Sequence, residues 1–199
     1  TATSLLITGA LHEDGLADTA DALGGSLTRE RLFEILKDSR VGSFGAAALI
    51  LTLATRASLT AELGSRAIWA LALAGCVARV GPVWLIARLP YVTPRGRSKS
   101  GFVAHGTVRH AVVATSWGLG TLALCVHLGM VAPARALATV SAAMVVSVGT
   151  ARYYLHRAGG VTGDFLGATE QLAEIFVLAA LAWGASPPAP RFQENNTAP

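Results

Sequence analysis

Gly9 to Gly25 reads GALHEDGLADTADALGG, and the rest of the chain is organised around this stretch. A helix places its three aspartates, Asp14, Asp18 and Asp21, on one face, because they stand at i, i+4 and i+7. Three like charges on one face repel each other, whereas a hard cation bound between them removes that repulsion. Mg²⁺ prefers oxygen ligands and commonly binds carboxylates together with substrate phosphates. The stretch therefore predicts a metal-dependent phosphate site, with a solvated acidic helix face as the alternative.

The composition of the chain is typical of an integral membrane protein. Of its 199 residues, 52% are hydrophobic and only 14% are charged, whereas soluble domains average about 25% charged residues. The formal charge of +4 is small. Basic loops on the cytoplasmic side explain it better than a nucleic-acid surface does, so no nucleic-acid partner is expected. Cys76 and Cys125 lie in apolar runs without metal-like spacing, and we interpret them as core residues.

Five apolar stretches are long enough to predict membrane-spanning helices, so the expected fold class is all-α, a polytopic transmembrane helix bundle. They cover residues 44–59, 67–87, 111–131, 136–155 and 165–184. A short amphipathic helix capped by Ser26 or Thr28 is expected before them. Residues 1–185 are expected to form one integral membrane catalytic domain that lacks its N-terminal apolar part. Residues 186–199 are expected to be a disordered polar tail.

Charged residues gather on one side of this predicted bundle. With residues 26–42 in the cytoplasm and alternating spans, the connections at 88–109 and 156–164 also face the cytoplasm. These regions and Arg152 hold eleven of the sixteen Lys and Arg residues, as the positive-inside rule expects. Ten of the twelve Asp and Glu residues fall in two segments of the same side. We therefore expect a multi-pass protein of the cell inner (cytoplasmic) membrane with a cytoplasmic-face active site. Four arginines are expected on or toward the other side: Arg56, Arg66, Arg135 and Arg191.

The second acidic segment begins with the last span. Asp164 stands at its start, where a carboxylate suits a helix N-terminus. Glu170 and Glu174 lie further on, i and i+4 in a strongly apolar helix. An ionisable group inside a membrane costs roughly 2.5–3.5 kcal/mol on insertion scales, and it marks a functional site or a buried pair. Arg79 lies inside another span, and it is a candidate partner for one of these glutamates.

Phosphoryl transfer relies on positioning, metal ions and cationic groups rather than on covalent chemistry by the protein. The predicted cytoplasmic side supplies several cations for phosphate charge: Arg40, Arg79, Arg95, Arg97, Lys99 and Arg152. His12 is a candidate base or phosphate donor, and equally an interfacial residue beside the acidic helix. The sequence contains no Walker loop, and it has no G-x-G-x-x-G after a strand.

Several parts of the chain resemble the adenosylcobinamide-GDP ribazoletransferase family, also called the cobalamin synthases. Residues 12–21, HEDGLADTAD, resemble the family's signature. Residues 37–45, KDSRVGSFG, resemble its second block, and residues 160–168, GVTGDFLGA, resemble its last. Arg79 and the glycines and prolines after it fit the middle region. The match covers residues 8–175 in the family's order.

The resemblance implies an integral membrane, Mg²⁺-dependent transferase of the last steps of cobalamin (vitamin B12) biosynthesis. Such an enzyme joins adenosylcobinamide-GDP to α-ribazole, or to α-ribazole 5′-phosphate. It releases GMP and gives adenosylcobalamin or its 5′-phosphate. The implied partners are these substrates and the lipid bilayer, and a homo-oligomer is left open.

Residue by residue, the resemblance assigns roles to the same positions. The implied metal ligands are Asp14, Asp18, Asp21 and Asp164. The implied catalytic residues are Asp18, Asp21 and Arg40, with Asp21 as the candidate base. Phosphate and substrate contacts are implied for His12, Lys37, Arg40, Arg79 and Gly163. Asp38 is expected to orient Arg40 rather than to bind metal.

Two other functions stay open on the sequence alone. A CDP-alcohol phosphotransferase acting on lipid also uses spaced aspartates, but its motif has Ala-Arg after Asp-Gly-x-x. Here Asp14 and Gly15 are followed by Leu16, Ala17 and Asp18. A cation-coupled transporter also carries acids in its spans. Against it, the acids share one surface with basic loops, and no inverted repeat is visible.

Overall fold

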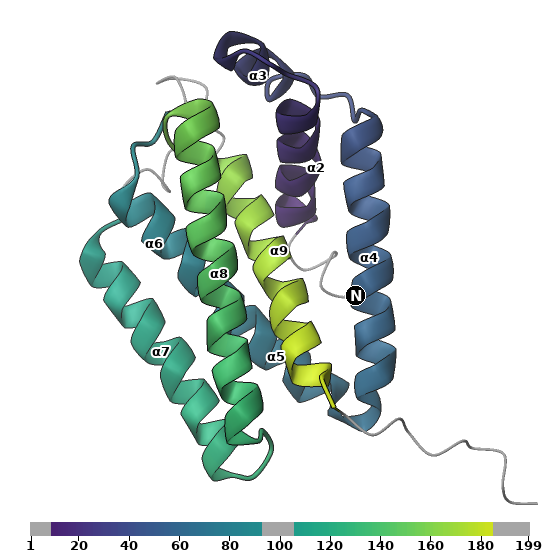
Figure 1. Ribbon diagram of the computed structural model, residues 1–199, viewed down its shortest axis with the longest axis vertical. Helices are drawn as coiled ribbons and strands as arrows, with labels where there is room; N and C mark the ends of the chain where they lie inside the picture. The colour runs from purple at the N-terminus through teal and green to yellow at the C-terminus, as the bar shows by residue number, and fades with distance from the viewer. Residues whose placement is uncertain (1–8, 93–105, 185–199) are drawn as a thin grey trace, which may run out of the picture.

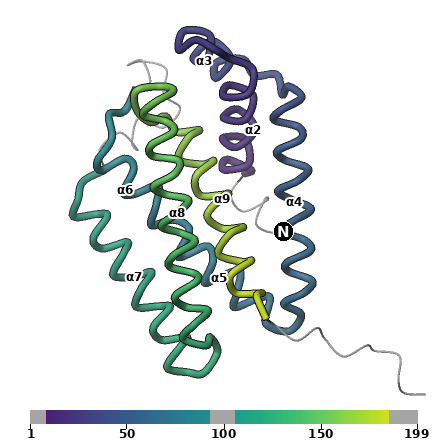
Figure 2. The backbone as a smooth tube through the Cα atoms, viewed as in Figure 1, coloured from purple at the N-terminus to yellow at the C-terminus, as the bar shows by residue number. Residues whose placement is uncertain are grey.

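The computed structural model describes residues 9–92 and 106–184, which form a bundle of helices (Figures 1 and 2). Its helices are α2 (Leu11–Gly24), α3 (Arg29–Ile35), α4 (Ser43–Leu63), the 3-10 turn η1 (Gly64–Arg66), α5 (Ala67–Ala78), α6 (Val80–Arg88), α7 (Val108–His127), α8 (Pro133–Ala158) and α9 (Gly163–Ala182). Within the described ranges, extended pairing is limited to one isolated bridge between Tyr91 and Val161. The predicted all-α fold class is confirmed.

Four helical stretches of the described chain are long and apolar enough to cross a membrane. They are Ser43–Arg88, Val108–His127, Pro133–Ala158 and Gly163–Ala182. The first reverses direction at η1, where Gly64 has a φ of 55° that favours glycine. Its two arms are α4 and the α5–α6 segment (Figure 1), which correspond to the first two predicted spans. The chain is therefore a multi-pass transmembrane helix bundle.

The last helix, α9, is the central element of the bundle. It packs against α2, α4, α5, α6 and α8, and it lies between α8 and α2 in Figure 2. Of its apolar stretch, 72% is buried inside the protein, against 17% for α7 and 11% for α8. The outer helices therefore present most of their surface to the surroundings, while α9 is enclosed by protein.

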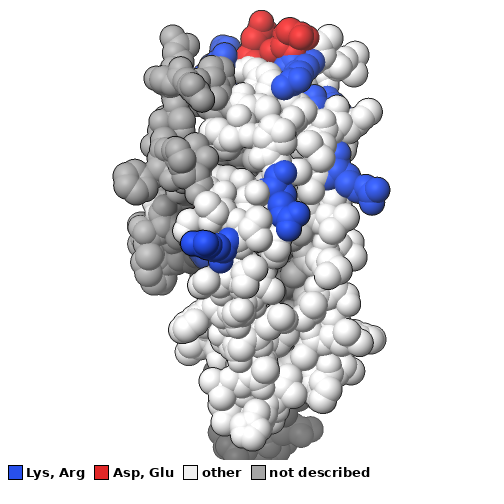
Figure 3. All heavy atoms as spheres, turned by 90° about the vertical axis from the view of Figure 1, so that its left-hand side faces the viewer, with Lys and Arg blue, Asp and Glu red and all other residues white. Residues whose placement is uncertain are grey.

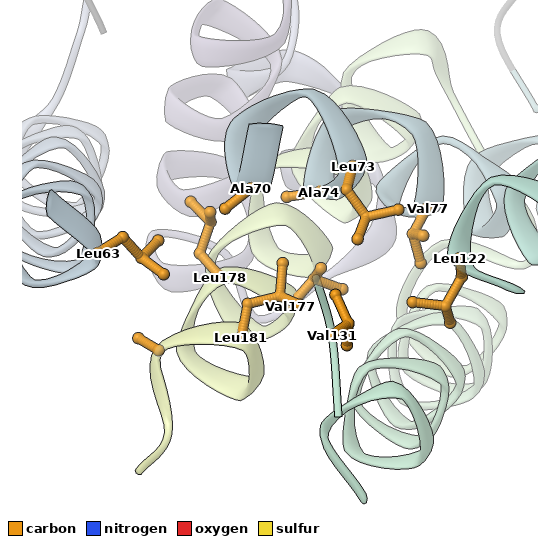
Figure 4. Packing of buried hydrophobic residues seen from close by; sticks show 11 residues of the cluster. Leu63, Ala70, Leu73, Ala74, Val77, Leu122, Val131, Val177, Leu178 and Leu181 are labelled. Atoms are coloured by element: carbon orange, nitrogen blue, oxygen red, sulfur yellow. The ribbon is translucent and has the colours of Figure 1, made fainter. Parts of the chain in front are cut away.

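One half of α9 packs in a purely apolar cluster (Figure 4). Leu73, Ala74 and Val77 of α5 meet Val177 and Leu178 of α9 there, and α7 adds further aliphatic contacts. All five of these side chains are buried. This cluster forms the apolar core of the end of the bundle that lies away from α3.

Charged side chains gather toward the end of the bundle near α3. On the face drawn in Figure 3, the described Lys, Arg, Asp and Glu residues lie between the top and about mid-height, and the lower part of this face shows none. This uneven distribution agrees with the predicted gathering of charges on one side of the membrane.

The structure shows which residue caps α3 and where α8 begins. Thr28, not Ser26, caps α3, because its side chain accepts the backbone N–H of Arg31 at 3.3 Å. Pro133 takes the first position of α8, so this helix begins earlier than predicted. Three segments discussed from the sequence lie outside the described residues: the start of the chain, the basic group Arg95, Arg97 and Lys99, and the polar tail.

Candidate active site

Helices α2 and α9 approach each other closely at two glycines. A Cβ on Gly15 of α2 would lie 2.9 Å from the backbone oxygen of Asp164. A Cβ on Gly167 of α9 would lie 3.3 Å from the Cα of His12. Gly163 and Gly167 are spaced as in the small-residue motifs that let membrane helices pack backbone to backbone. The close spacing of the two helices therefore depends on the absence of a side chain at Gly15 and Gly167, and it places Asp164 against the Asp14 end of α2.

Asp21 lies at the other end of α2 and holds the start of α4. Its Oδ2 accepts the backbone N–H of Gly42 at 2.7 Å, and its Oδ1 accepts that of Gly45 at 2.9 Å. Gly42 is the N-cap of α4, so the carboxylate lies at the positive end of that helix. A Cβ on Gly45 would clash with Asp21 and lie 2.9 Å from the Ala17 oxygen. The two glycines of the KDSRVGSFG block are therefore required for this contact.

Arg40 and Asp38 form an exposed pair just before α4. The Arg40 guanidinium donates to the Asp38 carboxylate from Nε at 3.0 Å and from Nη2 at 2.7 Å. These hydrogen bonds hold the pKa of Asp38 down, at about 2. The pairing expected of Asp38 with Arg40 is present, and the role of Asp38 in orienting Arg40 stays a prediction. Lys37 is also exposed in this connection, so two predicted phosphate-binding cations lie at the entrance to α4.

A group of charged and titratable side chains, the interior charge cluster, lies between α2, α4, α5 and α9. Its members are His12, Glu13, Arg56, Arg79, Glu170 and Glu174. Glu13, Arg56 and the two glutamates on α9 are buried, whereas the side chains of His12 and Arg79 are 27% and 50% exposed. Arg56 of α4 lies 2.7 Å from Glu174 through Nη2 and 3.7 Å from Glu13 through Nη1. All three side chains are about 6% exposed. Arg56 thus joins α4 to both α9 and α2.

The second half of the interior charge cluster is centred on Glu170. Arg79 Nη1 lies 3.2 Å from its Oε1, and His12 Nδ1 lies 3.5 Å from its Oε2. Gln171 donates to Oε2 at 3.1 Å. Arg79 stands at the junction of α5 and α6, just before Pro82, and it also donates to the Gly75 carbonyl at 2.7 Å. The expected pairing of Arg79 with an intramembrane glutamate is confirmed.

Sequence reasoning missed Arg56. The charge pattern predicts it on or toward the opposite membrane surface, whereas the structure buries it beside Glu13 and Glu174. The available signal was its position inside the apolar run of the first predicted span, the same signal that singled out Arg79. A lone arginine in such a run needs a carboxylate partner, and Glu174 supplies one.

The predicted metal ligands are divided between two places. On α2, Asp14 is exposed and Asp18 is half-buried, and Asp164 of α9 is half-buried near them. Asp21 instead accepts backbone N–H groups at the start of α4. Among residues 9–92 and 106–184, no three His, Cys, Asp or Glu side chains are arranged to hold a metal ion. As placed, these residues do not form a complete Mg²⁺ site, and metal binding stays a prediction.

Gly163 is the first residue of α9. Thr162 caps this helix by accepting the backbone N–H of Phe165 at 3.3 Å. Tyr154 of α8 stacks on the Phe165 ring with 4.3 Å between centroids, which fixes the first turn. The GVTGDFLGA block therefore builds the start of α9, where Asp164 meets α2.

Comparison with known proteins identifies relatives over almost the whole chain. The family described as cobalamin-5-phosphate synthase matches residues 1–182. An adenosylcobinamide-GDP ribazoletransferase from Bradyrhizobium diazoefficiens is 44% identical over 183 residues, which cover 91% of this chain and 68% of that protein. One from Leptothrix cholodnii is 41% identical over 187 residues, covering 92% and 70%. No solved structure matches the chain.

Proposed function

The chain belongs to the cobalamin-5-phosphate synthase family, and on that premise we propose that it transfers adenosylcobinamide phosphate from adenosylcobinamide-GDP to α-ribazole or α-ribazole 5′-phosphate. The products are GMP and adenosylcobalamin or its 5′-phosphate. The observation that carries the proposal is the 44% identity to a ribazoletransferase over 91% of the chain. The family predicted from the sequence is confirmed, and it disfavours both the lipid phosphotransferase and the transporter.

The bond changes define what the protein has to supply. A ribose hydroxyl oxygen of the acceptor attacks the pyrophosphate phosphorus on the cobinamide side. A new P–O bond forms, the P–O bond to GMP breaks, and the hydroxyl proton passes to a base. Groups that carry the phosphate charge and a carboxylate that takes the proton are therefore needed.

We assign these tasks to residues at the end of the bundle near α3. Arg40 and Lys37, both exposed before α4, would contact the pyrophosphate. Arg79 and His12, the partly exposed members of the interior charge cluster, would also contact substrate. Both oxygens of Asp21 accept backbone N–H groups, so we favour Asp18 over Asp21 as the proton acceptor. Asp21 then acts by anchoring α4, and with it the segment that carries Arg40.

Mg²⁺ dependence is part of the proposal, supported by the spacing of Asp14 and Asp18 and by the packing of Asp164 against Gly15. A bound Mg²⁺ would neutralise pyrophosphate charge. Because the described residues do not complete a metal site, no step is assigned to the ion. We also propose that this end of the bundle faces the cytoplasm at the inner membrane, as the bias of basic residues favours.

The test is a product assay on the whole chain in lipid. The protein is incubated with adenosylcobinamide-GDP and α-ribazole, with and without Mg²⁺, and GMP and adenosylcobalamin are measured together. We expect equal amounts of both products in the presence of Mg²⁺ and none without it. A parallel reaction with a CDP-alcohol and a lipid acceptor should release no CMP. Absence of cobalamin with Mg²⁺ present would contradict the proposed activity.

A further inference from the structure

We propose that Arg56 is a positioning residue that sets the rotation of α2, and so the direction of Asp14 and Asp18, by pairing with Glu13 and Glu174. This inference rests on the proposed function, because it assigns the two aspartates to the reaction. Arg56 would touch no substrate, since its side chain lies inside the bundle and is only 6% exposed.

The first argument is geometric. The Arg56 guanidinium lies 2.7 Å from Glu174 of α9 and 3.7 Å from Glu13 of α2. A guanidinium presents its N–H donors in a rigid planar fork, so two carboxylates that share it are held in a defined relation. One residue of α4 therefore connects both helices that line the candidate site.

The second argument concerns what prevents α2 from turning about its own axis. The glycine contact between Gly15 and Asp164 sets how closely α2 and α9 approach and which face of α2 meets α9, and contacts at the two ends of α2 add to it. Asp21 ties the far end of α2 to α4. Glu13 ties the near end through Arg56, and Glu13 is the residue next to Asp14. With both ends tied, α2 cannot turn about its axis without breaking a buried charge contact.

The third argument weighs stability as an alternative explanation. Buried ion pairs are often replaced by apolar residues of similar volume without loss of stability. A bundle made of apolar helices could therefore pack this position with aliphatic side chains. Three charged side chains from three helices, each with an exposed fraction of 6%, are better explained by a need for one defined arrangement.

The test compares variants of the full chain in lipid nanodiscs, with turnover expressed per folded molecule. Arg56→Met is expected to lower kcat on the order of 10²-fold, the effect of misplacing a reacting group by about 1 Å, with KM for both substrates little changed. Arg56→Lys keeps the charge and should recover part of kcat. Arg66→Met changes a half-buried arginine at the α4–α5 reversal and should leave kcat unchanged.

A triple variant separates positioning from folding. Arg56→Met with Glu13→Gln and Glu174→Gln leaves no unpaired charge inside the bundle, so it should fold even where Arg56→Met alone does not. We expect its thermal stability to return toward wild type while kcat stays low. Wild-type kcat per folded molecule in the triple variant, or in Arg56→Met, would overturn the proposal.

Hydrogen exchange of the α2 amides provides a measurement that does not depend on catalysis. Exchange in residues 11–24 should accelerate in both the Arg56→Met and triple variants and remain slow in Arg66→Met. Unchanged α2 exchange would contradict the positioning role even if the transferase activity is present. If wild-type protein makes no cobalamin, the proposed function fails, while faster α2 exchange in these variants would still show that Arg56 anchors α2.

Discussion

Helices α8 and α9 have nearly the same mean hydropathy and are both long enough to cross a membrane, yet they differ in what surrounds them. Protein buries 72% of the apolar stretch of α9 and 11% of that of α8. Helix α9 carries Asp164, Glu170 and Glu174, whereas α8 contains no acidic residue. Enclosure by other helices, rather than hydropathy, decides which span can carry carboxylates.

Each carboxylate in the interior of α9 has a cationic partner from another helix. Glu174 contacts Arg56 of α4, and Glu170 contacts Arg79 at the α5–α6 junction. On α8, large apolar side chains such as Leu137 and Val145 are about 70% exposed in the described bundle, as expected for contact with lipid. The comparison predicts that substitutions on the α9 side are costly and that matched substitutions on α8 are not.

The largest expected effect is on turnover, from a substitution of Asp18 on α2. Asp18→Asn removes a carboxylate that we assign to proton transfer, so turnover should fall by roughly 10²–10⁴-fold, while the amount of folded protein in the membrane stays the same. Product formation by purified protein measures this. Glu62→Gln, at an exposed acid near the end of α4, is the control. Near-normal turnover in Asp18→Asn would remove Asp18 from the site.

The next largest difference between α9 and α8 is expected in the free energy of unfolding when a leucine is truncated. Leu178 of α9 is fully buried, whereas Leu137 of α8 is 70% exposed. Leu178→Ala should lower the free energy of unfolding by about 2–5 kcal/mol because it leaves a cavity. Leu137→Ala should change it by less than about 0.5 kcal/mol. Reversible unfolding in mixed micelles gives both values, and equal costs would contradict the assignment of α8 to the lipid-facing layer.

Glycine substitutions test the close approach of α2 to α9. Gly15→Ala places a Cβ 2.9 Å from the Asp164 backbone oxygen, so the helices must separate. We expect a loss of about 1–3 kcal/mol from overpacking, together with reduced turnover. Gly149→Ala on α8 meets nothing within 4 Å and should be neutral or slightly stabilising. The two variants are compared by thermal denaturation, and a neutral Gly15→Ala would show that the contact is not required.

The smallest of these effects is expected from loss of the α4 cap. Asp21→Ala removes the acceptor for the Gly42 and Gly45 N–H groups, and losing a helix cap costs about 0.5–2 kcal/mol. The loss should appear as faster hydrogen exchange at the start of α4. Asp21→Asn keeps an acceptor oxygen and should exchange more slowly than Asp21→Ala. A stability change confined to α2 would argue against the capping role.

Much of this fold was predictable from the sequence, because membrane spans depend on length and apolarity. Arg79 was identified as an unusual residue for the same reason, and its glutamate partner followed. The burial of Arg56 was not predicted, because the charge pattern favours the opposite membrane surface for it, although it lies inside an apolar run as Arg79 does. Which helix is enclosed depends on tertiary packing, and α8 and α9 are nearly indistinguishable in hydropathy.

The role of Asp21 shows a second limit of the sequence. Its i, i+4, i+7 spacing with Asp14 and Asp18 predicts one shared face, but the last of the three turns toward α4. The explanation is in Gly42 and Gly45, whose N–H groups Asp21 accepts. Glycines allow close backbone approach, but the sequence alone does not identify the group that approaches Gly42 and Gly45.

The central claim is that transfer occurs at the end of the bundle near α3 and that this end faces the cytoplasm. Its most direct test is product formation in sealed vesicles of opposite orientation. Adenosylcobinamide-GDP is large and charged, so it reaches only the face to which it is added. We predict adenosylcobalamin from inside-out vesicles, its loss in Asp18→Asn, and none from right-side-out vesicles. Equal product from right-side-out vesicles, or full activity of Asp18→Asn, would contradict the claim.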